Sequence, residues 1–192
     1  MFRIISSIDI FYREGNDGPW STFSLRVGSN STKSQVVRLM ASTALPTTWV
    51  VWSPACNTTQ CVDNRGGVFN QNYSSTWREK GTYDLWFEKN LNYTGNGLYG
   101  FDTIGLGRDA SEGQTLDGQV VATFFEQSFH FGFFGLNPQP TNFTDFRDPI
   151  PSFMQTLKDL ARIPSKSYGY TAGNQYRKSC YYILTETGFD VF

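Results

Sequence analysis

Few side chains in this sequence could act as an acid, a base or a nucleophile. His130 is the only histidine, in the stretch Phe-His-Phe-Gly. A lone histidine on an aromatic strand is typical of a packed, hydrogen-bonded side chain, so a Ser-His-Asp triad is not expected. Asp102 is followed by Thr103 and Ile104. Because a tight Asp-Thr-Gly loop would need glycine at residue 104, Asp102 is predicted to lie on a strand.

No metal or cofactor site is predicted. One histidine and three scattered cysteines do not make a tetrahedral zinc set. The glycine-rich run 97–107 lacks the Gly-Lys-Ser/Thr ending of a phosphate loop, and strand-like sequence flanks it. We therefore expect a protein with neither metal nor cofactor.

Cys56 and Cys61 enclose the polar residues Asn-Thr-Thr-Gln. Their spacing differs from the Cys-x-x-Cys of redox and metal-binding pairs, and it favours a disulfide that closes a small loop. Cys180, the third cysteine, is predicted to be free. A disulfide implies an oxidising compartment, so the sequence favours a secreted or cell-surface protein.

Asn-x-Ser/Thr sequons recur along the chain, and they favour a glycosylated ectodomain over chance matches in a polar surface. They start at Asn30, Asn57, Asn72, Asn92 and Asn142. The first seventeen residues make a poor signal peptide, because Asp9 interrupts their apolar stretch. The expectation is an incomplete N-terminus, with an uncleaved or distant signal as the alternative.

Composition excludes several classes of protein. Sixteen Lys and Arg against seventeen Asp and Glu leave no basic excess, which argues against a nucleic-acid partner bound through phosphate neutralisation. No apolar run approaches the roughly 20 residues of a membrane span. Aromatic residues reach 17%, which argues against disorder.

Strand patterns dominate the chain. Phe23, Leu25 and Val27 alternate with polar residues, and short β-branched or aromatic runs follow at 36–40, 47–52, 83–87, 119–127 and 128–136. Asn96-Gly97 predicts a hairpin turn, and Asp117-Gly118 predicts a second turn. One helix is expected at 152–162, with a Ser152–Gln155 capping box and a stop at Pro164. The prediction is a mainly β domain with one short helix.

Several blocks in this order resemble the N-terminal lobe of pepsin-like aspartic proteases, in the secreted or cell-surface fungal branch. They are GPWSTFSLRVG, VVRLM, Ser42-Thr43-Ala44 with LPTTWVV, the small cysteine loop, FNQNYSSTW, YGFDTIGLG and FFGLN. The resemblance covers about residues 18–177 and implies orthogonally packed sheets. It also implies a peptide-binding groove, so an extended peptide or protein is the expected partner.

The catalytic motif of that family is degenerate in this sequence. The family's first aspartate stands in Asp-Thr-Gly-Ser-x-x-x-Trp-Val, and counting back from Trp49-Val50 places Ser42 at that position and Ala44 where glycine is expected. A serine hydroxyl cannot replace one of two carboxylates that share a proton. No catalytic residue is therefore assigned. Tyr93 is the only candidate for the family's flap tyrosine.

The resemblance divides the chain into an extension at 1–17, a lobe at 18–177 and an atypical tail at 178–192. The tail carries no second Asp-Thr-Gly or Asp-Ser-Gly, so the second lobe is expected to be missing from this chain. The main interpretation is an inactive homologue that could still bind an extended peptide. The alternatives are an active endopeptidase in a longer form, and a surface glycoprotein with a structural or partner-binding role.

Overall fold

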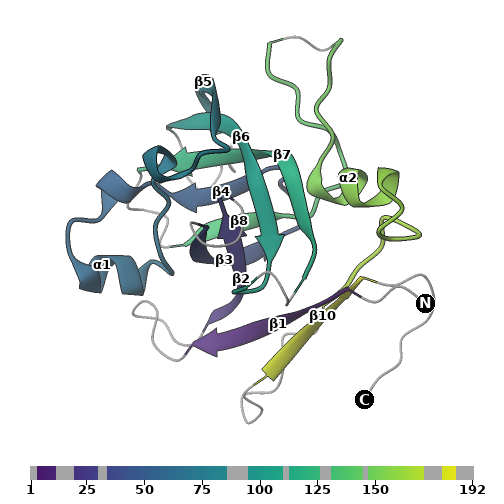
Figure 1. Ribbon diagram of the computed structural model, residues 1–192, viewed down its shortest axis with the longest axis horizontal. Helices are drawn as coiled ribbons and strands as arrows, with labels where there is room; N and C mark the ends of the chain where they lie inside the picture. The colour runs from purple at the N-terminus through teal and green to yellow at the C-terminus, as the bar shows by residue number, and fades with distance from the viewer. Residues whose placement is uncertain are drawn as a thin grey trace.

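The computed structural model is mainly β, as the sequence predicts (Figure 1). It describes residues 4–11, 20–29, 34–85, 95–109, 113–125, 131–144, 147–170 and 179–184. The strands are β1 (Ile4–Phe11), β2 (Trp20–Val27), β3 (Gln35–Ser42), β4 (Thr48–Val51), β5 (Arg78–Asp84), β6 (Asn96–Leu106), β7 (Thr115–Phe124), β8 (Gly132–Gly135), β9 (Gly169–Tyr170) and β10 (Ser179–Leu184). The helical segments are η1 (Ser53–Ala55), α1 (Thr59–Asn64), η2 (Gln71–Tyr73) and α2 (Phe153–Asp159). No helix in these ranges is long and apolar enough to cross a membrane.

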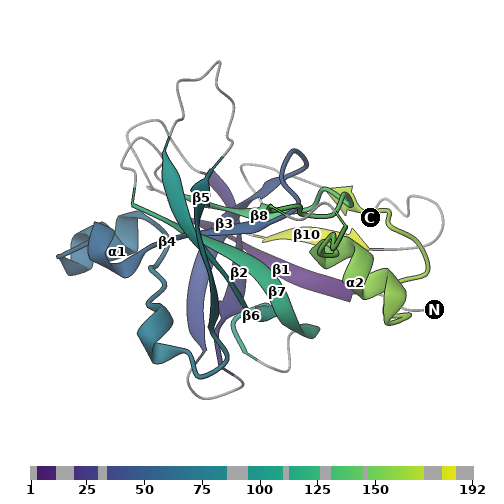
Figure 2. The ribbon, with the colours of Figure 1, turned by 90° about the horizontal axis from the view of Figure 1, so that it is seen from above.

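Six strands close into a barrel. Hydrogen-bonded neighbours run β6, β7, β4, β8, β3, β2 and back to β6. β5 lies outside the barrel against β6, while β1, β10 and β9 continue the sheet from β2. Figure 2 shows β1 and β10 extending toward the side that holds α2, with α1 on the opposite side. In place of separate packed sheets, the strands thus form one continuous sheet that closes on itself.

The core forms two clusters, and β4 contributes to both. Val50 packs in the first cluster with the buried side chains of β2 and the apolar face of α2. Trp49 and Val51 point to the other side and pack in the second cluster, with Phe124 of β7. All four residues of β4 are buried. Burial on both faces explains why Trp49, Val50 and Val51 follow one another without the alternation of a half-exposed strand.

The predicted helix is α2. The Ser152 hydroxyl accepts a hydrogen bond from the Gln155 N–H at 3.2 Å, as a capping serine does. The reciprocal half of the predicted capping box is not made: Gln155 Oε1 accepts instead from Lys166 Nζ at 2.8 Å, while the Gln155 amide nitrogen donates to Asp159 Oδ1 at 2.7 Å. A second short helix, α1, was not predicted; Thr58 caps its start by accepting from the Cys61 N–H.

Two turn predictions were wrong. Asn96-Gly97 begins β6 and pairs with β5, because Gly97 leaves room for the Leu85 side chain, whose Cδ2 would lie 2.4 Å from a Cβ there. The link between β5 and β6 spans residues 85–95, of which 86–94 lie outside the described ranges. Asp117-Gly118 lies inside β7 as a β-bulge, where Gly118 has φ +65°. Asn-Gly and Asp-Gly signals are local, so they register neither the packing around Gly97 nor the bulge at Gly118.

β8 lies between two strands that are consecutive in the chain. It pairs in parallel with β3, with Ser42 opposite Gly135, and it pairs antiparallel to β4 at Trp49 and Phe133. The five residues 43–47 that link β3 to β4 therefore bridge over one end of β8. This insertion is the feature that positions the Ser42-Thr43-Ala44 segment.

The glycines at the two ends of β8 are required by close backbone contact. A Cβ on Gly132 would lie 2.1 Å from the Trp49 carbonyl oxygen, and one on Gly135 would lie 2.3 Å from the Thr47 carbonyl oxygen. These neighbours are backbone atoms, so no side-chain rotation relieves the overlap. The strand can occupy this space only with glycine at both positions.

We expect Gly135→Ala to lower the free energy of unfolding by about 3 kcal/mol or more, at the upper end of overpacking costs. The measurement is urea-induced unfolding followed by circular dichroism. Ala44→Gly is the matched control, because it makes the opposite change at a nearby exposed residue and should cost under about 1 kcal/mol. Equal stability of Gly135→Ala and the wild type would contradict the close packing of β8.

Candidate functional site

The segment Ser42-Thr43-Ala44 forms a loop between β3 and β4, as the sequence predicts. Ser42 ends β3 and is half-buried, whereas Thr43 and Ala44 are exposed. The Ser42 hydroxyl oxygen accepts a hydrogen bond from the Ala44 N–H at 3.3 Å. A serine hydroxyl that accepts from the backbone two residues on stabilises a turn, so Ser42 has a local structural role.

The FFGLN block, residues 133–137, is hydrogen-bonded to this loop. The Leu136 N–H donates to the Ser42 carbonyl at 2.8 Å, and the Asn137 N–H donates to the Leu45 carbonyl at 3.0 Å. The Asn137 side-chain amide adds a bond to the Ala44 carbonyl at 3.2 Å. Two sequence blocks about ninety residues apart therefore form one hydrogen-bonded unit at the end of β3 and β8.

This unit holds no carboxylate of its own. Neither the segment 35–56 nor the segment 131–139 contains aspartate or glutamate. Ala44 is accommodated without backbone strain, since Ala161 is the only residue other than glycine with positive φ in the described ranges. Side chains that could act as a general base are thus absent from both segments that build the loop.

Asp102 is a buried carboxyl elsewhere in the barrel. It lies on β6, as predicted, with 1% of its surface exposed. Its Oδ1 accepts hydrogen bonds from the hydroxyls of Ser74 at 3.0 Å and Thr76 at 2.5 Å, and from the Thr103 N–H at 2.8 Å. Ser74 and Thr76 belong to the SSTW block. A second pair of sequence blocks is therefore held together by side-chain hydrogen bonds.

Burial has the largest effect on the pKa of Asp102. Removal from water raises the pKa of its carboxyl, and the hydrogen bonds from Thr76, the Thr103 backbone and Ser74 offset only part of that rise. Its Oδ2 and the Oε1 of Gln119, its cross-strand neighbour on β7, have no hydrogen-bond partner within the described residues. A neutral carboxyl can donate a hydrogen bond, whereas an ionised one only accepts.

An aromatic cluster that sequence reasoning missed covers the β5–β6 ribbon. The Phe143 ring lies 4.7 Å from the Tyr83 ring and 5.5 Å from the Tyr99 ring, and Lys80 Nζ lies 5.5 Å above Phe143. Burial and the nearby Asp84 raise the pKa of Tyr99. Phe143 comes from the segment between β8 and α2, so these contacts fasten that segment to β5 and β6.

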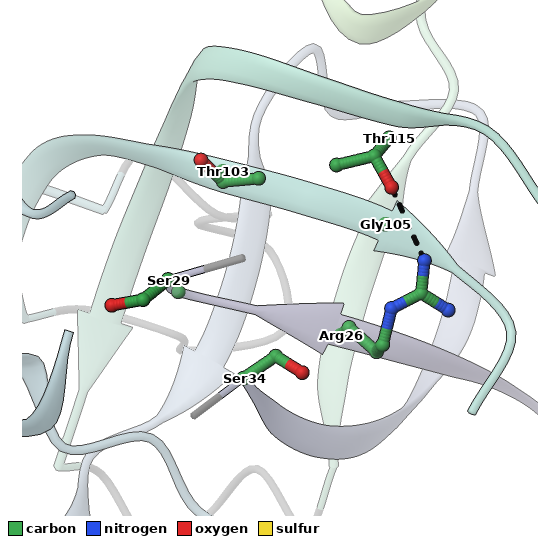
Figure 3. A pocket seen from close by; sticks show the side chains of 7 residues that line it. Arg26, Ser29, Ser34, Thr103, Gly105 and Thr115 are labelled. Atoms are coloured by element: carbon green, nitrogen blue, oxygen red, sulfur yellow. Dashed lines mark hydrogen bonds between the residues drawn. The ribbon is translucent and has the colours of Figure 1, made fainter. Parts of the chain in front are cut away.

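A buried arginine, also missed, lines a small polar pocket (Figure 3). Because Arg26 alternates with Leu25 and Val27 along the strand, its side chain is expected to point away from the core and into solvent. Only 4% of its surface is exposed. Its guanidinium donates to Thr115 Oγ1 at 3.2 Å and to three backbone carbonyls, those of Leu106, Gly107 and Asp109. The pocket measures about 10 Å³. That is room for about one water molecule, so this pocket fits no substrate.

The disulfide prediction is confirmed. Cys56 and Cys61 are bonded, with their Cα atoms 5.4 Å apart. Asn57, Asn72 and Asn142 are exposed, as predicted for glycosylation sites. Asn30, Asn92, Tyr93 and His130 lie outside the described residues. Cys180 lies in β10, which pairs with β1, but its side chain is outside the described part of the structure.

Neither metal-binding clusters nor known relatives point to a further site. The residues that the structure describes contain no group of three or more His, Cys, Asp or Glu side chains that could hold a metal ion. No protein-family model matches this sequence, and no curated protein is significantly similar to it. The candidate site therefore rests on its own geometry.

Replacing Asp102 should change how stability depends on pH. Since folding raises the pKa of Asp102, its stabilising contribution is complete below the unfolded pKa of about 4 and is lost as the pH rises through the folded value. We expect Asp102→Asn to gain stability relative to the wild type as the pH rises from about 4 toward 7. The measurement is urea unfolding across this range.

Asp148→Asn is the control for that experiment, because Asp148 is exposed. Its unfolding free energy should follow the wild-type pH profile. If the Asp102→Asn profile also runs parallel to the wild type, burial does not perturb this carboxyl.

Proposed function

We propose that the chain is a pepsin-like aspartic-protease lobe without catalytic activity. The observation that carries the proposal is the loop at the end of β3, where Ser42 stands at the aspartate position and no acidic residue lies in either segment that builds the loop. A carboxylate pair activates water by sharing a proton, and a serine hydroxyl is too weak an acid to take one of those places.

Contacts between the resembling blocks support the family assignment. Ser42-Thr43-Ala44 binds FFGLN through backbone hydrogen bonds, and SSTW binds the aspartate of YGFDT through Ser74 and Thr76. Blocks that occur by chance would have no reason to pair in space. Their pairing supports the view that the blocks belong together in one fold, in which they meet at two places, the loop at the end of β3 and Asp102 on β6.

Binding of an extended peptide is part of the proposal. Thr43 and Ala44 are exposed, and the Phe143 cluster places aromatic side chains beside the β5–β6 ribbon. The outer edge of β5 is a poor platform for strand addition, because it carries the exposed charges of Arg78, Glu79 and Lys80 and a bulge before Gly81. A peptide would therefore bind near the loop rather than along that edge.

Location in an oxidising compartment, secreted or at the cell surface, completes the proposal. It is supported by the disulfide between Cys56 and Cys61 and by three exposed sequon asparagines.

The purified protein should not hydrolyse peptides at acidic pH. The assay is cleavage of a protein substrate and of an extended fluorogenic peptide, with and without a pepsin-type transition-state inhibitor. Ser42→Ala is the control and should behave as the wild type. Cleavage that the inhibitor blocks would refute the proposal, and Asp102→Asn would then test whether the buried carboxyl supplies the acid.

Calorimetry with the same inhibitor and with an uncleaved peptide separates the remaining roles. Saturable binding in the absence of cleavage identifies a peptide-binding lobe. Its absence leaves a structural or partner-binding glycoprotein as the role of the chain.

A further inference from the structure

The three described sequons differ in what folding does to their reactive groups. N-glycosylation uses the asparagine side-chain amide and the hydroxyl two residues later. Asn57, Asn72 and Asn142 are all exposed, so a glycan on any of them projects into solvent. The hydroxyl partners Thr59, Ser74 and Thr144 lie in different surroundings.

Asn142 and Thr144 stay accessible after folding. Both are exposed, and both lie outside any helix or strand in the segment between β8 and α2. Phe143, between them, packs against Tyr83 and Tyr99. Anchoring of that ring leaves the two polar side chains of the sequon directed toward solvent.

Folding makes the hydroxyl of the second sequon, that of Ser74, less accessible. Asn72 lies in η2, where its N–H donates to Asn70 Oδ1 at 3.0 Å. Ser74 is half-buried, and its hydroxyl donates to Asp102 Oδ1 at 3.0 Å. A transferase that needs this hydroxyl would have to break a bond to a buried carboxyl.

The disulfide constrains the first sequon. Asn57 to Thr59 lies inside the loop that Cys56 and Cys61 close, with their Cα atoms 5.4 Å apart. Five extended residue steps would span about 17 Å, so the closed loop cannot adopt an extended acceptor conformation. Thr59 is also the first residue of α1, whose N-terminus Thr58 caps.

We propose that Asn57, Asn72 and Asn142 carry N-linked glycans, and that Asn57 and Asn72 accept theirs only before the domain folds. The donor is a lipid-pyrophosphate-linked oligosaccharide with its membrane transferase. The amide nitrogen forms a bond to C1 of the sugar as the C1–O bond breaks, the lipid pyrophosphate leaves, and the amide gives up one proton. This proposal is independent of the proposed protease-like lobe.

Protein secreted from a eukaryotic host tests whether the sites are used. Glycans are removed enzymatically in heavy-oxygen water, and peptide mass spectrometry then reads occupancy at each asparagine. We expect all three sites to be occupied, and the single variants Asn57→Gln, Asn72→Gln and Asn142→Gln each to lose one glycan. An unmodified protein would overturn the proposal.

Unglycosylated protein from a bacterial host tests the order of events. A soluble N-glycosyltransferase and a nucleotide-activated sugar are added to folded, oxidised protein and to reduced, denatured protein. We expect Asn142 to react in both, and Asn57 and Asn72 to react at least tenfold faster in the denatured sample. Similar rates at all three sites in the folded protein would overturn the order.

Cys56→Ser with Cys61→Ser separates the two protected sites. In the folded double variant, Asn57 should become reactive while Asn72 stays protected by the Ser74–Asp102 bond. Protection of Asn57 without the disulfide would refute the role of the loop. If the double variant proves unfolded by circular dichroism, the comparison of folded with denatured wild type still decides the order.

Discussion

The space between β3 and β4 constrains the structure more than any other feature. β8 fills it, and its two terminal glycines approach the carbonyls of Trp49 and Thr47 too closely for any side chain. A strand inserted between two consecutive strands forces their connection to bridge over its end. The position of the Ser42-Thr43-Ala44 loop and the closure of the barrel through β4 and β7 both follow from this insertion.

A second constraint acts at the other side of the barrel through Asp102. The residues around Ser74 form no strand of their own, and hydrogen bonds from Ser74 and Thr76 hold them against β6. Burial of the carboxyl disfavours its charge, so the same contacts that order this segment make it sensitive to protonation.

Features that depend on residues close together in the sequence were predicted correctly. Alternation placed Phe23, Leu25 and Val27 in the core, and a capping serine placed the start of α2. The short cysteine spacing predicted the disulfide. Asn96-Gly97 misled because this glycine lies in a strand rather than a turn, where a Cβ would lie 2.9 Å from the Thr123 carbonyl oxygen and 2.4 Å from Leu85 Cδ2. The burial of Arg26 was not predicted, because alternation only tells the two faces of a strand apart. The carbonyls that bury this guanidinium come from a segment about eighty residues away.

Under the proposed assignment a serine has replaced an acid at residue 42, and the hydrogen bonds of the loop show why the fold does not depend on that side chain. Leu136 binds the carbonyl of Ser42, and Asn137 binds those of Leu45 and Ala44. These contacts use backbone oxygens, which every residue supplies, while the Ser42 side chain adds only its bond to the Ala44 N–H. A change of side chain at this position therefore alters the chemistry that the loop can perform and leaves the bonds that shape it intact. Under the proposed assignment, a lobe of this kind can lose catalysis and keep the surface on which an extended peptide would lie.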